Sequence, residues 1–360
     1  MSAVGIAPNY AVHPGTMLEE WLEENRMSQT EFALRIGRSV KNVNQIVNGV
    51  ADVSPDLALG LETVTGVPAR LWLNMQAQYD ADVARIRRDE LLRDSVAWLD
   101  NLPVGDLRRR GYIAATARDK LTQVSECLRF FGVSSVDAWN AVWLEPEAQF
   151  RQSGAYEAHT GAIAAWLRLG ELESQQIEPQ PFSRARLEEG LPLIRALTRE
   201  PQGSKIIPRL LRLAEENGVV LLFIPDVSGT RLYGATRWRH GNPVIQMSLR
   251  RKTDDQFWFT LFHELAHVLL HGRDRLFLDG SDSRGTTEEQ EADEFSCDLL
   301  IPKDRVSELA GLRSLDDVDR FAAEIGVSSG VVVGRMQHDG LRNYNWGTRL
   351  KRTVAFAEAA

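Results

Sequence analysis

The segment FTLFHELAHVLLHG, residues 259–272, places three histidines and a glutamate in an otherwise apolar run. Residues four apart lie on the same face of an α-helix, so His263 and His267 project as neighbours. Two imidazoles at this spacing can bind one zinc ion (Zn2+), each at about 2.0–2.1 Å. Glu264 then lies beside the metal, where its carboxylate can take a proton from water and pass it to a leaving amine. This is the HExxH arrangement of zinc-dependent peptidases.

A zinc site of this kind needs a third protein ligand. The segment TEEQEADEFSCDLLIP, residues 287–302, supplies carboxylates on a predicted amphipathic helix. Glu288 and Glu291 lie about one turn apart, and either can face the histidines while Glu294 and Asp298 stay in solvent. Two segments with matching chemistry in the expected order favour a zinc site over a chance match.

His271 lies four residues beyond His267 and resembles a further ligand. Three successive turns of histidine would spread over about 12 Å, which is too far for one ion to bind all three. We therefore expect His271 to support a ligand or cap the helix. Tyr233, Arg237 and His240 lie near predicted strands and are candidates to polarise a scissile carbonyl, although an ordinary packing or surface role is the favoured interpretation of each residue taken alone.

A second constellation occupies residues 27–49, MSQTEFALRIGRSVKNVNQIVNG. Ser28 and Glu31 have the spacing of a capping box at the start of a short helix. Gly37 permits a tight turn, and Ser39 is a good N-cap for a second helix. Two short helices around a glycine turn are the layout of a helix-turn-helix unit.

The second of these helices separates apolar from polar side chains. Its apolar stripe is Val40, Val43, Ile46 and Val47, and asparagine, glutamine and lysine fall opposite. Because asparagine and glutamine can pair bidentately with adenine, this face suits contacts to base edges. The predicted DNA contacts are Gln29, Arg38, Lys41, Asn44, Gln45 and Asn48. The alternative is a helical bundle whose polar face meets water, since residues 14–90 hold eight basic against twelve acidic side chains.

Composition limits the class of protein. The 360 residues are 43% hydrophobic and 26% charged, with a formal net charge of −8, as in an ordinary soluble chain without a general basic coat for nucleic acid. No apolar run approaches the roughly 18 residues of a membrane-spanning helix, and the first residues lack the features of a signal peptide. The two cysteines, Cys127 and Cys297, have no metal or redox spacing, which favours a cytoplasmic location.

Periodicity changes along the chain. Helical patterns dominate up to about residue 217, and strands are expected at 219–225, 231–239 and 243–250 before the histidine-containing helix. The fold class is therefore α+β and predominantly α. We expect four regions: a helix-turn-helix domain, a helical connector or interaction region, a zinc peptidase domain and a helical extension, at residues 1–90, 91–204, 205–305 and 306–360.

Residues 205–305 resemble the ImmA/IrrE family of metallopeptidases, through GATRWRHGNPVIQMSLRRKTDDQFWFTLFHELAHVLLHG and EEQEADEFSCDLLIP. The resemblance implies a zincin-like core in which His263, His267 and Glu291 bind zinc and Glu264 is the catalytic base. It favours Glu291 over Glu288, a choice that spacing alone leaves open, and gives Asp293 a supporting place behind the ligands. Known members cleave or inactivate a partner repressor protein.

Residues 12–80 resemble the HigA-type antitoxins of the Xre superfamily. HPG at the start, SQTEFA, the NG after the second helix and GVPARLWLNMQAQYD carry the likeness. It implies a five-helix DNA-binding domain, usually a homodimer, that represses its own operon and neutralises a co-encoded toxin.

Two functions from different classes follow. In the first, the chain is a DNA-binding regulator whose zinc-dependent endopeptidase domain acts on a regulatory partner, either constitutively or after a trigger. In the second, it is an antitoxin and autorepressor of a toxin-antitoxin operon, and its zinc domain is sensory or structural. The intact HExxH motif favours at least potential catalysis, because a structural site would not need Glu264 and is normally closed by four protein ligands.

Overall fold

The computed structural model describes residues 10–144, 160–200, 206–248, 250, 253–273, 275–280 and 286–354. The chain forms two compact units, Met1–Val96 and Ala97–Ala360. The regions 91–204 and 306–360, which the sequence sets apart as connector and extension, are therefore largely grouped with the sheet in the second unit.

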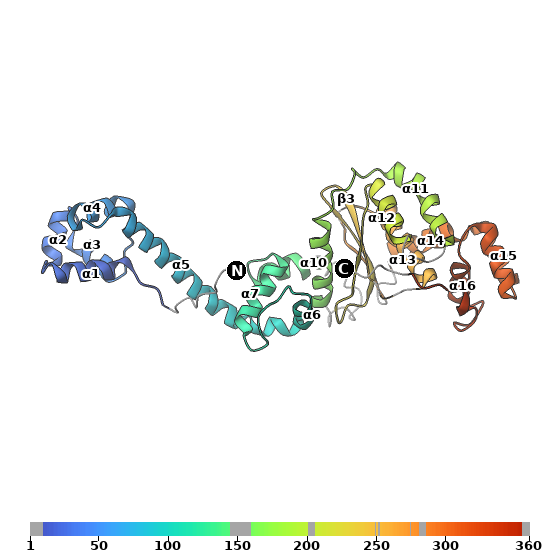
Figure 1. Cartoon of the computed structure of the whole chain (residues 1–360), viewed down its shortest axis with the longest axis horizontal. Helices are drawn as coiled ribbons and strands as arrows, with labels where there is room; N and C mark the ends of the chain where they lie inside the picture. Colours follow the sequence, from blue (N-terminus) through green and yellow to red (C-terminus); the bar gives the residue numbers. More distant parts are fainter. Residues whose placement is uncertain are drawn as a thin grey trace. The chain divides into compact units, whose positions relative to one another are not determined.

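The first unit contains the five helices that the resemblance implied. They are α1 (Pro14–Glu24), α2 (Gln29–Ile36), α3 (Val40–Val47), α4 (Pro55–Thr65) and α5 (Ala69–Asp94), drawn in blue in Figure 1. The side chains of Ser28 and Ser39 accept hydrogen bonds from the third backbone N–H of α2 and α3, as N-caps do. Gly37 ends α2 at φ 67°, a left-handed conformation that glycine adopts without strain.

Apolar side chains of α1 to α5 form the core of this unit. Phe32, Ile46 and Trp72 are at most 1% exposed. Two details differ from expectation. Val40 is 43% exposed, because it is the first residue of α3 and precedes the packed turn. The Glu31 carboxylate pairs with the Arg35 guanidinium at 2.5 Å, and only the serine half of the expected capping box is present.

Most of the second unit is helical. Before the first strand it contains a 3₁₀ segment that begins at the unit boundary, six α-helices and two further short segments within the described residues. These are η1 (Val96–Asn101), α6 (Val104–Arg109), α7 (Lys120–Phe131), α8 (Val136–Trp139), η2 (Asn140–Leu144), α10 (Thr160–Ser174), α11 (Arg184–Ala196), η4 (Leu197–Arg199) and α12 (Ile206–Glu216).

Further helical segments follow the first three strands. They are α13 (Asp254–Leu270), α14 (Thr287–Leu300), η5 (Lys303–Gly311), α15 (Leu315–Ile325), α16 (Ser329–His338) and η6 (Thr348–Leu350). The predicted class, α+β and predominantly α, is confirmed.

The described part of the second unit contains a four-stranded sheet, with strands in the order β1-β3-β2-β4. The three expected strands are β1 (Val220–Ile224), β2 (Leu232–Arg239) and β3 (Asn242–Ser248), and the additional β4 is Phe277–Gly280. β1 pairs with β3 in parallel, and the other two pairings are antiparallel. β3 is hydrogen-bonded on both sides and therefore has no free edge with which a substrate could pair.

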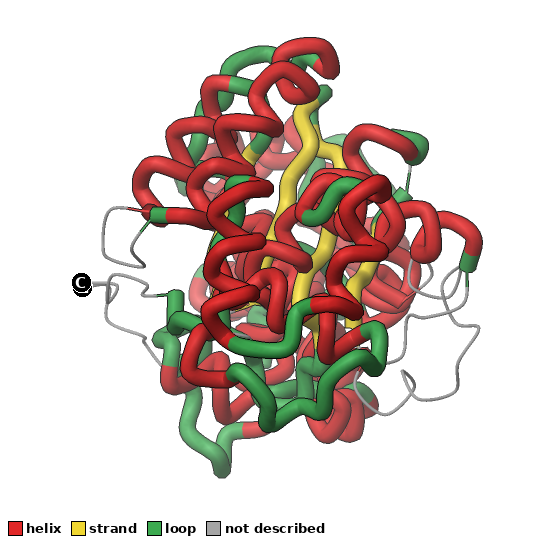
Figure 2. The backbone as a smooth tube through the Cα atoms, turned by 90° about the vertical axis from the view of Figure 1, so that its right-hand side faces the viewer, coloured by secondary structure: helices red, strands yellow, loops and turns green. Residues whose placement is uncertain are grey.

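Helices cover the two faces of the sheet. Gln246 of β3 donates to the carbonyl of Trp166 on α10 at 2.7 Å, and the neighbouring Ile245 and Met247 point into the core shared with α12 and α13. Figure 1 shows α10 on one side of the strands and α12 and α13 on the other. In Figure 2 helices also cover the strands on the side that faces the viewer.

Arg195 at the end of α11 joins two other helices. Its guanidinium donates to the carbonyls of Leu299 at 2.6 Å, Leu300 at 3.0 Å and Ile325 at 2.7 Å. The last carbonyls of a helix have no partner within the helix. One partly buried side chain therefore satisfies the ends of both α14 and α15.

Arg195→Met should lower the free energy of unfolding by about 2–4 kcal/mol, because three carbonyls lose a charged donor. Urea denaturation of the full chain followed by circular dichroism measures this change. The matched control on α11 is Arg184→Met, since the Arg184 side chain is 62% exposed and pairs with Glu188 alone among the described residues. The effect of this control should stay within about 0.5 kcal/mol. Equal losses for both variants would show that the carbonyl contacts of Arg195 contribute nothing.

Candidate metal centre and helix-turn-helix face

The helix α13 carries the HExxH motif through the centre of the second unit. Asp254 and Asp255 lie in its first turn, where carboxylates interact favourably with the helix dipole. Asp254 accepts hydrogen bonds from the Ser328 hydroxyl at 2.8 Å and from the backbone N–H of Arg352 at 3.0 Å. These contacts fix the start of α13 against α16 and the segment that follows it.

His263, His267 and Glu289 form a compact group of possible metal ligands. The two Nε2 atoms are 3.0 Å apart, and the Glu289 carboxylate oxygens lie 3.3 Å from His263 Nε2 and 3.4 Å from His267 Nε2. Ligand atoms at about 2.0–2.1 Å from one tetrahedral zinc ion are roughly 3.3 Å from one another. The three side chains therefore already have the separations that a shared ion requires.

The structure does not place Glu291 in this group, although the resemblance favoured it. Glu291 is exposed and its Oε2 lies 3.1 Å from His271 Nε2, while Glu288 pairs with Arg275 at 2.5 Å. Residues two apart point to opposite sides of a helix, so Glu289 and Glu291 cannot share one face. The sequence signal for Glu289 was its spacing of four from Asp293, which puts both carboxylates on the face toward His263.

The outer nitrogens of both histidines also have partners. His263 Nδ1 lies 2.9 Å from Asp293 Oδ1, and His267 Nδ1 lies 2.9 Å from His271 Nδ1. If the Nε2 atoms face an ion, each Nδ1 carries the proton. His267 then donates to His271, and the Nε2–H of His271 donates to Glu291. His271 and Asp293 thus lie behind the candidate ligand imidazoles, as expected of residues that orient them. Glu291 contacts His271 and lies one residue farther from the candidate ligands.

Burial and neighbours shift the pKa values of the motif in different directions. Burial lowers the pKa of His263, but the carboxylates of Asp293 and Glu289 outweigh it and raise this pKa to about 11. Burial and the neighbouring imidazoles of His263 and His271 lower the pKa of His267 to about 2.

Glu264 is fully buried between α13 and β2. The Thr236 hydroxyl donates to its Oε2 at 2.6 Å, while Oε1 is buried without a hydrogen-bond partner among the described residues. Burial raises the pKa of this carboxyl well above its usual value. Gly234 of β2 lies against it, and a Cβ at that position would overlap Oε1. A carboxyl of raised pKa, held by one hydroxyl, suits a group that accepts and releases a proton.

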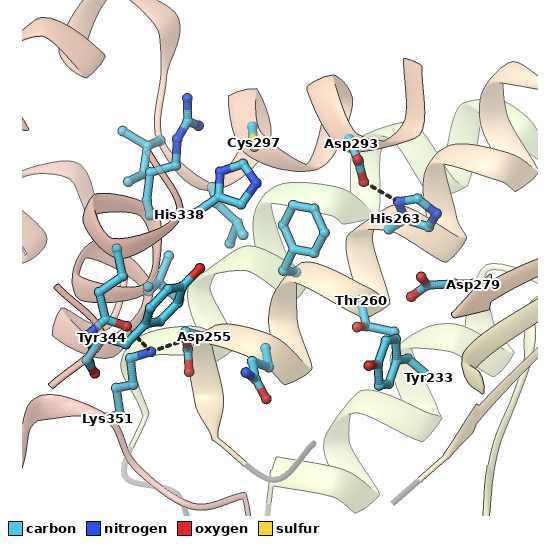
Figure 3. A pocket seen from close by; sticks show the side chains of 18 of the residues that line it. Tyr233, Asp255, Thr260, His263, Asp279, Asp293, Cys297, His338, Tyr344 and Lys351 are labelled. Carbon is cyan, nitrogen blue, oxygen red and sulfur yellow. Dashed lines mark hydrogen bonds and ion pairs between the residues drawn. The ribbon is translucent and has the colours of Figure 1, made fainter. Parts of the chain in front are cut away.

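A cleft of about 370 Å³ opens beside the ligand group. Figure 3 shows His263, Asp279 and Tyr233 near one end and Tyr344, Lys351 and Asp255 near the other. Tyr233 therefore reaches the cleft, as a residue that polarises a carbonyl would.

The other two polarising candidates do not line the cleft. Arg237 donates to the carbonyl of Leu167 on α10 at 2.9 Å. His240 lies in the turn between β2 and β3 with φ 49°. Neither Arg237 nor His240 is therefore placed to contact a substrate in the cleft.

The predicted DNA-contacting residues lie on α2, α3 and the turn between them. Arg38, Lys41, Asn44 and Asn48 are exposed, and Gln29 and Gln45 are half-buried. Asn44 Nδ2 donates to Gln29 Oε1 at 3.2 Å, and Asn48 Nδ2 donates to the carbonyl of Asn44 at 2.7 Å. The amide of Asn44 thus joins the start of α2 to the exposed face of α3. No helix in the described parts of the chain is long and apolar enough to cross a membrane.

Glu289→Ala should weaken zinc binding by more than about hundredfold, because a ligand is lost, whereas Glu291→Ala should cost about ten- to hundredfold through His271. Competition with a zinc chelator, read with metal analysis of the dialysed protein, measures both. Glu294→Ala is the control, since Glu294 is exposed on the same helix. A larger loss for Glu291→Ala than for Glu289→Ala would return the ligand role to Glu291.

Known proteins resemble the N-terminal part of the chain. An uncharacterised HTH-type transcriptional regulator, YddM of Escherichia coli (strain K12), is 32% identical over 82 residues, which are 21% of this chain and 87% of that protein. Virulence-associated protein I of Dichelobacter nodosus is 37% identical over 75 residues, 21% of this chain and 69% of that protein. The solved Pseudomonas aeruginosa antitoxin HigA with the higBA promoter is 32% identical, with a TM-score of 0.21, and the match covers 21% of this chain and 83% of that one.

Two family descriptions match separate parts of the chain. Residues 18–72 match the helix-turn-helix family, and residues 214–337 match the IrrE N-terminal-like domain of the M78 peptidases. The first match spans α2 and α3, and the second spans the sheet, the ligand group and most of α16. The chain therefore belongs to the HTH-type transcriptional regulators through its N-terminal domain, and its C-terminal part carries a match to the IrrE N-terminal-like domain over residues 214–337.

Proposed function

We propose that this chain is a DNA-binding regulator whose second unit is a zinc-dependent endopeptidase acting on a regulatory partner protein. The observation that carries the proposal is the ligand group His263, His267 and Glu289 beside a buried glutamate and an open cleft. Two imidazoles and one carboxylate are a frequent protein ligand set of catalytic zinc, which keeps a further position for water or substrate. The cleft opens beside His263 and Glu289, so a substrate bound there would lie close to the ion that these residues would hold.

The residues fit a zinc ion on their own geometry. The three donor atoms are 3.0–3.4 Å apart, and both imidazoles have an acceptor behind Nδ1 that turns Nε2 inward. Zinc in such a site supplies Lewis acidity toward water and toward a carbonyl oxygen.

The side chains of the chain account for the remaining chemistry. Glu264 takes the proton of the attacking water on its carboxylate and delivers it to the amine of the leaving peptide, while Thr236 holds Oε2 in place. Tyr233 lines the cleft beside His263 and is the candidate to donate to the oxygen of the scissile carbonyl. Asp293 and the pair His271–Glu291 keep the ligand imidazoles oriented.

The substrate would enter the cleft beside β4, whose last residues, Asp279 and Gly280, line the cleft. Side-chain pockets of the cleft would then supply selectivity for the peptide that binds there.

The DNA-binding unit narrows the class of substrate. It would bind operator DNA, as a homodimer, in the cytoplasm where that DNA lies, with Gln29, Arg38, Lys41, Asn44, Gln45 and Asn48 as contacts. A peptidase tethered to an operator meets regulatory proteins at high local concentration. The substrate is then a repressor, a co-encoded toxin or the chain itself.

One observation favours a second candidate function. Glu264 is 0% exposed and does not line the cleft, so the proposed base is shielded from a substrate bound there. In this alternative the chain is an antitoxin and autorepressor, and the zinc domain senses a signal without turning over at rest. A trigger that moves β2 relative to α13 would then expose Glu264 and start proteolysis.

Glu264→Gln should abolish zinc-dependent cleavage of the partner while zinc content and DNA binding stay unchanged, because the amide keeps the shape but cannot accept the proton. The wild type and the variant are expressed with the products of the neighbouring genes, and cleavage fragments are identified by mass spectrometry. Lys303→Gln serves as a control, since Lys303 is exposed and pairs only with Asp298. Full protection of cells by both proteins without any cleaved partner would select the antitoxin alternative.

Asn44→Ala should weaken binding to operator DNA by about 1–3 kcal/mol and relax its sequence preference, because a base contact is lost. Lys41→Ala should weaken binding to all sequences alike and reduce the salt dependence by about one phosphate contact. Fluorescence anisotropy with DNA from upstream of the chain's own gene measures both. Arg70→Ala on α5 is the control, and an equal loss for it would contradict the assignment of the DNA face to α2 and α3.

A further inference from the structure

The cleft continues well beyond the metal ligands, and its middle section is apolar. Phe259 lies one turn before His263 on α13, with ring centroids 6.2 Å apart, and starts this section. Leu300 and Ile301 at the end of α14 and Val331 of α16 complete it. Cys297 of α14 lines the same section and is partly exposed. We name this apolar part of the cleft the α13–α16 pocket.

The far end of the α13–α16 pocket carries charges that are already compensated. Lys351 Nζ donates to Asp255 Oδ2 at 2.6 Å and to Gln337 Oε1 at 2.7 Å. Arg335 Nε donates to Asp339 Oδ2 at 2.7 Å. Lys351 and Arg335 are therefore each paired with a carboxylate, although Asp255 Oδ1 and Arg335 Nη1 are buried without a hydrogen-bond partner among the described residues. No net charge of these pairs is left over to attract a charged ligand.

The end of the cleft beside the candidate metal ligands, in contrast, carries several carboxylates. Glu289 and Asp293 lie at His263, and Asp279 of β4 lines the cleft beside them. An acidic group entering here meets like charges, while a basic group must leave water to pass Phe259 and Val331. A neutral apolar side chain suffers neither cost and removes apolar surface from water.

We propose that the α13–α16 pocket is the specificity subsite of the C-terminal domain, and that it takes a large apolar side chain of the substrate next to the bond at the metal centre. The cleft volume of about 370 Å³ is at the lower end of ligand pockets and suits one such side chain with the adjoining backbone. Tyr344 and Lys351, which line its far end, lie beyond the family match at 214–337. The subsite thus extends beyond the residues of that match, and it rests on the proposed zinc site.

Binding of small hydroxamates to the zinc-loaded full chain tests the subsite without requiring turnover. The hydroxamate group chelates zinc, so acetohydroxamate reports on the metal centre and 3-phenylpropanohydroxamate adds an apolar group. Succinic monohydroxamate adds a carboxylate instead. By isothermal titration calorimetry the phenyl compound should bind about tenfold tighter than acetohydroxamate or better, and the acidic compound no tighter.

A matched pair of variants locates the effect. Cys297→Phe fills the α13–α16 pocket from a partly exposed position, whereas Cys297→Ser keeps its volume. The preference for the phenyl compound should fall to within about twofold in Cys297→Phe and persist in Cys297→Ser, while acetohydroxamate binds both equally.

The possible results distinguish failure of the proposed subsite from failure of the proposed zinc site. Equal binding of acetohydroxamate and the phenyl compound to the wild type overturns the subsite and leaves the zinc site standing, and this result needs no variant to fold. A preference that survives in Cys297→Phe also overturns the location. Failure of every hydroxamate to bind the zinc-loaded chain overturns the zinc site, and the subsite with it.

Discussion

The burial of ionisable side chains on α13 is the constraint on which the rest of the second unit depends. His263, Glu264 and His267 are at most 2% exposed. A buried charge or polar group is costly unless it is hydrogen-bonded, so each of the three requires a partner. β2 supplies Thr236, α14 supplies Asp293, and the C-cap of α13 supplies His271. The sheet and α14 are thus held in a single register relative to α13, because a shift of either would leave a buried ionisable group without its partner.

The same constraint operates at the start of α13. Asp254 is fully buried, and its carboxylate accepts from Ser328, while Asp255 is paired with Lys351. These contacts reach 74 and 96 residues along the chain and place α16 beside α13. One helix, α13, therefore fixes both the wall of the cleft and the candidate metal ligands. Its first turn and its HExxH segment each carry buried ionisable groups, and different elements supply their partners.

Local patterns made much of this structure predictable. The spacing of His263 and His267 and the caps at Ser28 and Ser39 are local features, and the corresponding helices are present. β4 was missed because a strand of four residues has little periodicity of its own and depends on pairing with β2. Glu289 was missed because Glu288, Glu289 and Glu291 have the same chemistry. Which carboxylate faces the imidazoles depends on how α14 is rotated about its own axis relative to α13. That rotation follows from tertiary packing.

The packing of α14 on α13 also distinguishes the metal centre from a structural zinc site. Ala292, Ser296 and Leu300 are buried on α14, and Leu300 belongs to the same core as residues of α13. A structural site contributes folding energy through four protein ligands, and its domain often unfolds without the metal. Here the two helices that carry the candidate ligands share an apolar core, and Arg195 also ties the end of α14 to α11 and α15. Packing between helices therefore accounts for the positions of the candidate ligands, as the proposed catalytic role of a metal requires.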